Sequence, residues 1–198
     1  NGASVGYLES ILKYPGQTYE YSKFTQSTGL AKFLTKASIT EMVVGKHAGE
    51  NLTPVSYSFD QKTRKKHVTD KARFAGNRAT GMYKGNTYSL QTPVNVLDRA
   101  SLEIAVARDL KRNLPQLKYN VMERGEMKQY IFARLGSEPL ETSAGTFNTI
   151  KVEVKRKDQS RKTIYWMAKE LAYLPVKMLH EEDGDVISSV IREFSIRP

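Results

Sequence analysis

The sequence predicts a mostly β fold, an antiparallel β-barrel or a strongly curved β-sandwich with one α-helix packed on it. Two observations carry this prediction: short segments alternate between apolar and polar residues, and turn-forming residues separate these segments. A third observation is a single segment of helical periodicity near the middle of the chain. Because successive side chains of a strand point to opposite faces, such alternation is typical of sheets with one buried face.

Strands are expected along most of the chain. The alternation at residues 55–59 places Val55, Tyr57 and Phe59 on one face, and at residues 149–155 it does the same for Ile150, Val152 and Val154. The other expected strands cover residues 18–25, 30–44, 66–74, 81–90, 118–122, 129–135, 138–143, 162–167, 176–180 and 186–194.

Turn-forming residues separate the expected strands. Asp183-Gly184 is the strongest hairpin signal, because an Asp-Gly pair readily adopts the positive φ angles of a two-residue turn. Further turns are expected at Gly45, Gly76-Asn77, Gly85-Asn86, Arg124-Gly125-Glu126 and Ala144-Gly145.

The helix is expected at about residues 98–113. Leu102, Val106 and Leu110 recur at helical spacing and form one apolar stripe. Asp98 is suited to cap the amino terminus, and Pro115 follows the expected end. The chain has no internal repeat or low-complexity linker, so residues 1–198 are expected to form one barrel-like domain, with residues 1–17 as an ordered or flexible lead-in.

Composition excludes several classes of protein. The chain has no cysteine, which rules out a disulfide scaffold, a thiol enzyme and a Cys-based zinc finger. Its apolar runs are far shorter than the ~20 residues that a membrane-spanning helix needs. The chain begins with Asn1 rather than Met, which is expected of a processed protein or of an expressed chain whose leader has been removed.

The net charge of +10, from 31 Lys+Arg and 21 Asp+Glu in 198 residues, favours an anionic partner. The basic residues are spread along the chain, with two denser stretches at residues 62–67 and 151–162. Both stretches fall at expected hairpin ends, where charges are usually solvated. A soluble basic surface is therefore the simpler interpretation.

The sequence predicts no catalytic residue, no metal site and no cofactor. The three histidines, His47, His67 and His180, lack the spacing of metal ligands, and no phosphate-binding glycine loop is present. Ser101 lies near the start of the helix, where a nucleophile can be placed, although a helix cap explains it equally well. A pair of carboxylates brought together by the fold stays open, since that test is a distance.

The last third of the chain carries an ordered set of motifs. Thr142, Gly145, Phe147 and Thr149 are followed by Trp166-Met167-Ala168, Tyr173-Leu174-Pro175-Val176 and the turn Asp183-Gly184. This set resembles the exported bacterial family called the domain of unknown function 3108. The resemblance covers roughly the whole chain, with its specificity concentrated between Leu140 and Val176. It implies a secreted or periplasmic, barrel-like protein of Gram-negative bacteria, with no established activity. The missing leader fits that setting, and the implied export disfavours nucleic acid as a partner.

Two positions depart from the family pattern. Met167 stands where the family has Leu after the tryptophan, and Arg99-Ala100 separate Asp98 from Ser101 at the start of the helix. Gly145, Phe147 and Pro175 also have structural reasons to recur: a turn with positive φ, an apolar anchor and a strand start.

The predicted function is therefore non-enzymatic binding or cell-envelope maintenance in the periplasm, with a hydrophobic, glycan or anionic envelope ligand of unknown identity. Aromatic side chains would make the apolar contact and arginines would hold an anionic group. The candidate binding residues are Tyr57, Arg64, Arg73, Arg161, Tyr165 and Trp166. The alternatives are a hydrolase acting on envelope polysaccharide or lipid, and a basic surface that binds nucleic acid or anionic lipid.

Overall fold

A computed structural model describes residues 4–155 and 161–197 of the chain. Their backbone contacts divide them into two compact units. The first contains the described residues up to 102 together with 120–128, and the second contains 103–119 together with the described residues from 129 onward. The expectation of one domain stays a prediction.

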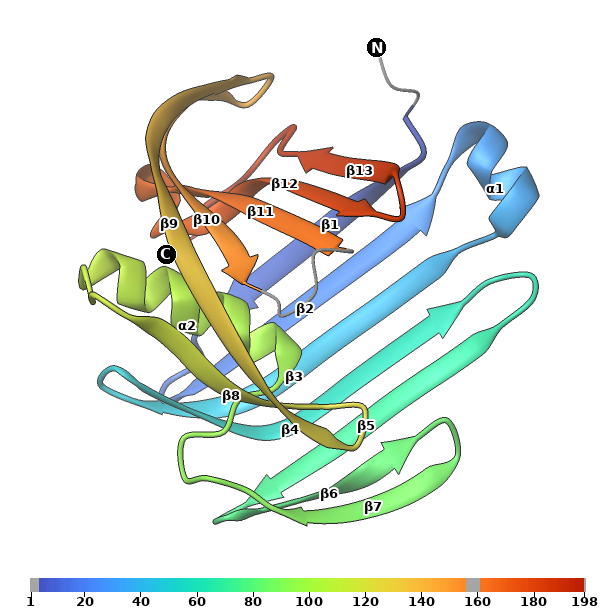
Figure 1. Cartoon of the computed structure of the whole chain (residues 1–198), viewed down its shortest axis with the longest axis vertical. Coiled ribbons are helices and arrows are strands. Elements are labelled where there is room, and N and C mark those ends of the chain that lie inside the picture. Colours follow the sequence, from blue (N-terminus) through green and yellow to red (C-terminus); the bar gives the residue numbers. More distant parts are fainter. Residues whose placement is uncertain (1–3, 156–160, 198) are drawn as a thin grey trace. The chain divides into compact units, whose positions relative to one another are not determined.

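Within the described residues, the first sheet has seven antiparallel strands that follow one another in chain order (Figure 1). Each strand pairs with the strands before and after it in the chain, because short turns join consecutive antiparallel strands. The strands are β1 (Gly6–Lys13), β2 (Thr18–Ser27), β3 (Ser38–Ala48), β4 (Asn51–Lys62), β5 (His67–Ala75), β6 (Arg78–Tyr83) and β7 (Asn86–Gln91).

The second sheet has six antiparallel strands within the described residues, in the order β13-β12-β11-β10-β9-β8. The strands are β8 (Leu117–Glu123), β9 (Glu126–Thr142), β10 (Gly145–Lys155), β11 (Arg161–Ala168), β12 (Leu174–Glu182) and β13 (Asp185–Val190). The chain is thus mostly β with two curved antiparallel sheets, as the sequence predicts. Asp183 and Gly184 both have positive φ, which confirms the expected hairpin turn.

The predicted helix is α2 (Arg99–Lys111), and its apolar stripe is buried. Asp98 caps it: its Oδ1 accepts hydrogen bonds from the N–H groups of Ala100, at 2.8 Å, and Ser101, at 2.9 Å. A 3-10 turn, η1 (Lys169–Leu171), precedes β12.

The sequence prediction was wrong at residues 30–35, which form a second helix, α1 (Gly29–Thr35), rather than part of a long strand. No strand was predicted for the lead-in, yet residues 6–13 form β1 and pair with β2. Two expected strands, at residues 129–135 and 138–143, are one strand, β9, and the segment 81–90 divides into β6 and β7.

Gly45 does not begin a turn but lies inside β3. The ring of Tyr19 occupies the space where a Cβ at Gly45 would stand, so a glycine is required for packing and not for a bend. At the same place β4 has a bulge: the register runs from Ser56 to Pro54 and skips Val55. Val55 is therefore exposed and does not share the buried face of Tyr57.

Each unit has its own apolar core. In the first, Tyr19, Tyr21, Val43, Tyr57 and Ala72 are buried at positions that the strand registers place on one sheet face. In the second, a cluster of buried side chains spans β10, β11 and β12, and consists of Phe147, Ile164, Trp166, Ala168 and Val176.

Candidate functional site

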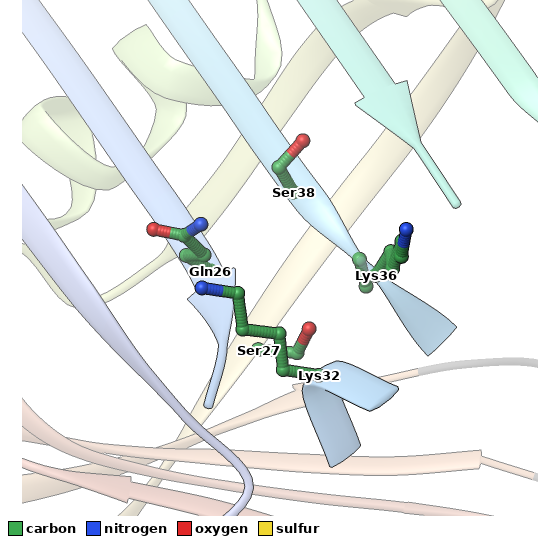
Figure 2. Close-up of a pocket in the computed structure, with 6 residues that line it drawn as sticks. Gln26, Ser27, Lys32, Lys36 and Ser38 are labelled. Carbon is green, nitrogen blue, oxygen red and sulfur yellow. The ribbon is translucent and has the colours of Figure 1, made fainter. Parts of the chain in front are cut away.

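A hollow of about 300 Å³ lies where β2 ends and β3 begins, beside α1 (Figure 2). We call it the β2–β3 hollow, and its walls are Gln26, Ser27, Lys32, Lys36, Ala37 and Ser38. The N–H of Ser27 donates to the carbonyl oxygen of Ala37 at 2.9 Å, which joins the two strand ends below α1. The hollow therefore lies beside the hydrogen bonds between β2 and β3, where α1 is inserted between these two strands.

The hydroxyl of Ser27 is the unusual group in the hollow. The residue is 9% exposed, and its Oγ has no hydrogen-bond partner among the described residues. A buried hydroxyl without a partner costs about 1–3 kcal/mol relative to a paired one. Such groups are rare in folded proteins, and Thr92 carries the only other unpaired buried hydroxyl among the described residues.

Two lysines give the hollow its charge. Lys32 and Lys36 are four residues apart, both are exposed, and neither forms an ion pair within the described part of the chain. Lys36 caps α1 in the left-handed region, at φ 47°, and its N–H donates to the carbonyl oxygen of Lys32 at 3.1 Å. The cap fixes the backbone that carries both ammonium groups.

The first basic stretch of the sequence lies at the same end of the sheet as the hollow. The N–H of Arg64 donates to the carbonyl oxygen of Thr35 at 2.8 Å, so the β4–β5 turn touches the end of α1. Ser38 also pairs with Lys62 across β3 and β4. We call this end of the first sheet, with Lys32, Lys36, Lys62, Arg64, Lys65 and Lys66, the cationic end.

A second polar group lies at the start of α2, within the first unit. The hydroxyl of Ser101 donates to Asp98 Oδ2 at 2.6 Å, and the Tyr19 hydroxyl lies 2.7 Å from Ser101 Oγ. All three side chains are fully buried. Burial raises the pKa of Asp98 to about 6, although the hydrogen bonds from Ser101 act in the opposite direction.

Glu41 forms the neighbouring buried contacts. It accepts a hydrogen bond from the Tyr57 hydroxyl at 2.7 Å and has Lys23 Nζ at 3.5 Å and Arg99 Nε at 3.7 Å. Burial alone would raise the pKa of Glu41, but the two cations and the hydrogen bond outweigh it and hold the pKa below its usual value. Tyr57 is thus a buried partner of a carboxylate.

The six candidate binding residues are divided between the two units, with Tyr57, Arg64 and Arg73 in the first. Tyr57 pairs with Ala72 and Arg73 pairs with Ser56, so Tyr57 and Arg73 point to opposite faces of the sheet. Arg64 lies at the cationic end. The structure therefore does not bring these three side chains to one place.

In the second unit, Arg161 pairs with Glu182, with Nε and Oε1 2.6 Å apart, and Tyr165 and Trp166 are successive residues of β11 that face opposite ways. Trp166 is buried and donates from Nε1 to Glu138 Oε1 at 2.6 Å.

Two lysines lie against the ring of Trp166. Lys151 Nζ and Lys177 Nζ are 5.2 and 4.4 Å from the ring centroid, on the strands that flank β11. These lysines cover the ring surface that a ligand would stack on.

The three motif residues of the resemblance occupy structural positions. Gly145 begins β10 at φ 123°, Phe147 is buried with Trp166 in the second core, and Pro175 lies near the start of β12 beyond its pairing with β13.

No group of three or more His, Asp or Glu side chains among the described residues is arranged to hold a metal ion. No helix in residues 4–155 or 161–197 has the length and apolar character needed to cross a membrane.

Sequence reasoning missed Ser27, Lys32 and Lys36. Assigning residues 30–44 to a strand placed the two lysines on alternate positions of a sheet and hid their helical spacing. The available signal was the pair Leu30 and Leu34 with Lys32 and Lys36, an i, i+4 pattern between residues that end two clear strands.

One of two solved structures compared with the chain supports the fold. The chain is similar to a "Beta-barrel-like Protein of Domain of Unknown Function DUF1849 from Brucella abortus", with a TM-score of 0.58, 7% identity, and coverage of 94% of this chain and 86% of that one. A DUF1089 family protein from Pseudomonas aeruginosa is matched at a TM-score of 0.35 and 10% identity, over 99% of this chain and 94% of that one.

The sequence itself has one decisive match. No curated protein matches the chain. The family model described as "Protein of unknown function (DUF3108)" matches residues 4–187, which include the first sheet with the β2–β3 hollow and the second sheet up to the middle of β13. The match agrees with the motif resemblance and covers nearly the whole chain, and on this basis the chain belongs to the DUF3108 family.

Proposed function

We propose that this protein is an exported, non-enzymatic binding protein of the bacterial envelope, and that the β2–β3 hollow binds an anionic group of its ligand. The group would be a phosphate or a carboxylate, which ammonium and hydroxyl donors recognise. The proposal narrows the hydrophobic or glycan ligand expected from sequence to one that carries such a group. The aromatic candidates Tyr57 and Trp166 do not support a stacking site, because each is already held by polar partners.

The observation that carries the proposal is the buried Ser27 hydroxyl without a partner in the described structure. Lys32 and Lys36 supply charge at the same hollow, and their own carboxylate partners are lacking among the described residues. A phosphate there would accept a hydrogen bond from Ser27 and interact with both ammonium groups.

The proposed location is the periplasm or the extracellular space. The support is the motif resemblance to an exported family. Detection of the protein in the periplasmic fraction of its host, beside a cytoplasmic marker, tests this part independently of any ligand.

The hydrolase alternative has less support. Ser101, the candidate nucleophile, is fully buried, caps α2 together with Asp98, and is hydrogen-bonded to Tyr19. A substrate does not reach this hydroxyl without opening the first core. No specific observation favours a second function over binding.

The binding proposal is tested by titrating the protein with inorganic phosphate and with glycerol phosphate, followed by NMR shifts of backbone amides. We expect shifts at Ser27 and Ala37, and at least about a tenfold loss of affinity in Ser27→Ala, since a hydrogen bond to a charged group contributes roughly 1.5–3 kcal/mol. The double variant Lys32→Gln/Lys36→Gln should lose affinity as well.

The matched control is Lys13→Gln/Lys46→Gln. It removes the same charge from exposed positions at the opposite end of the first sheet, where β1 ends and β3 approaches its last residues. Equal losses in the two double variants would mean that only net charge matters, and the proposal would fail. Shifts that avoid Ser27 and Ala37 would also overturn it.

A further inference from the structure

We propose that α1 and the cationic end dock onto an anionic lipid bilayer, so that Leu30 and Leu34 enter the lipid interface while the basic side chains contact the headgroups. The inference rests on the proposed function, because it assigns the anionic group of the β2–β3 hollow to a lipid headgroup rather than to a soluble molecule.

The first observation is the exposure of the apolar residues of α1. Leu30 is 76% exposed and Leu34 is 69% exposed, and their i, i+4 spacing places them on one side of the helix. Val5 lies close by, since its carbonyl oxygen accepts the N–H of Thr28 at 3.0 Å, and it is also exposed. Large aliphatic side chains exposed together mark a surface that meets an apolar partner.

The second observation is the charge around these leucines. Lys32 lies between them in α1, and Lys36 follows the last residue of the helix. The hydrogen bond from Arg64 to Thr35 brings the β4–β5 turn, with Lys65 and Lys66, to the same end. Neither segment 24–40 nor segment 61–69 contains Asp or Glu, and the adjoining Asp60 pairs with Lys62 at 3.8 Å. A polybasic surface with this composition is attracted to the negative surface potential of anionic lipid.

The third observation is the position of α1 relative to the first sheet. α1 lies at the end of the sheet, between β2 and β3, as a projecting turn (Figure 1). Apolar residues on a projecting element enter the interface of a bilayer, and lysines beside them remain among the phosphates. The β2–β3 hollow, directly beneath α1, is then placed to receive one headgroup phosphate at Ser27.

These observations favour a bilayer over a protein partner. A protein groove that accepts Leu30 and Leu34 would need acidic groups to match the lysines on several sides, whereas an anionic bilayer presents phosphates around any point of entry. The short helix also supplies few contacts for a specific protein interface, which typically needs about 800 Å² from each partner.

The test is co-sedimentation with vesicles of phosphatidylglycerol and phosphatidylethanolamine, against vesicles of phosphatidylcholine alone. We expect binding to the anionic vesicles that weakens as salt rises. Leu30→Ser/Leu34→Ser should lower the partition coefficient at least about tenfold, because both side chains leave an apolar environment. Val94→Ser is the matched control: Val94 is 87% exposed, and the nearby Thr92 bonds to Asn77 at the opposite end of β5.

A second measurement reports insertion directly. The chain has no cysteine, so Leu30→Cys gives a single site for a polarity-sensitive fluorophore. The emission of this fluorophore should shift to shorter wavelength on anionic vesicles, whereas the label on Val94→Cys should not shift.

The outcomes separate the two proposals. Phosphate binding at Ser27 without vesicle binding, or vesicle binding that Leu30→Ser/Leu34→Ser leaves unchanged, overturns the bilayer inference and leaves the proposed function standing. Vesicle binding that needs the leucines, in a protein that shows no phosphate binding at Ser27, overturns the proposed function instead.

Discussion

Two opposing effects act on the pKa of the Asp98 carboxyl group. As the cap of α2 it accepts two backbone hydrogen bonds, which favour the carboxylate, whereas complete burial favours the neutral acid. Burial is the larger effect, and the pKa rises to about 6. The residue therefore titrates in a pH range where an exposed aspartate, with a pKa of about 3.9, is already ionised.

The first prediction concerns Asp98→Asn. The folded protein holds a proton on Asp98 that the unfolded chain has released, so the free energy of unfolding of the wild type should fall as pH rises from about 4 to about 6. The shift of about two pKa units corresponds to roughly 3 kcal/mol. Asparagine also caps helices but does not titrate, so Asp98→Asn should lack this loss.

Urea unfolding at pH 4 and pH 7 checks this prediction. The free energy of unfolding of Asp98→Asn relative to wild type should increase across the interval. Glu41, with its pKa lowered, contributes stability that is lost as pH falls, but both proteins contain Glu41 and its effect largely cancels. The exposed Asp185, at the start of β13, gives the control Asp185→Asn. A difference that stays constant between the two pH values contradicts the prediction.

At the scale of single residues, sequence predicted the cap and little of the site. The Asp98 cap follows from local rules, because the capped amides are two and three residues away. The unpartnered hydroxyl of Ser27 depends on how residues 29–37 leave the sheet, and no local pattern states which serine loses its partner. The hydrogen bond from Tyr57 to Glu41 could not be predicted either, because it joins neighbouring strands and depends on how these strands align.

At the scale of elements, β3 shows how packing determines a glycine. Gly45 pairs with Tyr19, and the tyrosine ring lies over the glycine Cα. A Cβ at Gly45 would lie 2.3 Å from Tyr19 Cζ, which is far inside van der Waals contact. The ring cannot move freely, because its hydroxyl is bound to Ser101.

The second prediction is that Gly45→Ala destabilises the protein by about 1–3 kcal/mol, as overpacking of a full core does. Chemical denaturation measures the change. In a Tyr19→Leu background the same substitution should cost less than about 0.5 kcal/mol, because the clashing ring is gone. An equal cost in both backgrounds would show that the backbone of Gly45, and not the ring, sets the requirement.

Most elements were predictable from sequence because their signals are local. The hairpin at Asp183-Gly184 and the helix stripe of Leu102, Val106 and Leu110 depend on residues within a few positions of one another. α1 was missed because its residues are apolar on the solvent side, opposite to the pattern that burial produces. Val55 was assigned to the wrong face of β4, because the bulge reverses the side-chain direction there and the apolar-polar alternation of the sequence does not reveal a bulge.

At the scale of the whole chain, the boundary between the two units falls inside continuous elements. It lies within α2, between Leu102 and Glu103, and within β8, between Tyr119 and Asn120. Because backbone hydrogen bonds of a helix join residues four positions apart, unfolding the part of α2 in one unit also breaks hydrogen bonds of the part in the other unit. The two units are therefore expected to lose structure together.

The third prediction is a single unfolding transition for the chain. Trp166 is the only tryptophan and lies in the second unit, so its fluorescence reports that unit, whereas far-UV circular dichroism reports both sheets. The two urea curves should coincide, as they do for one cooperative domain. A fluorescence midpoint displaced from the dichroism midpoint would divide residues 1–198 into two domains.

The order of the strands has a consequence for how the chain acquires its structure. In the first sheet every pairing joins consecutive strands, from β1 with β2 to β6 with β7. Each ladder can close across a short loop, which keeps the entropy of loop closure and the contact order low for a β protein. The sheet can therefore grow hairpin by hairpin from the amino terminus, in the order in which a ribosome or a translocation pore releases the chain.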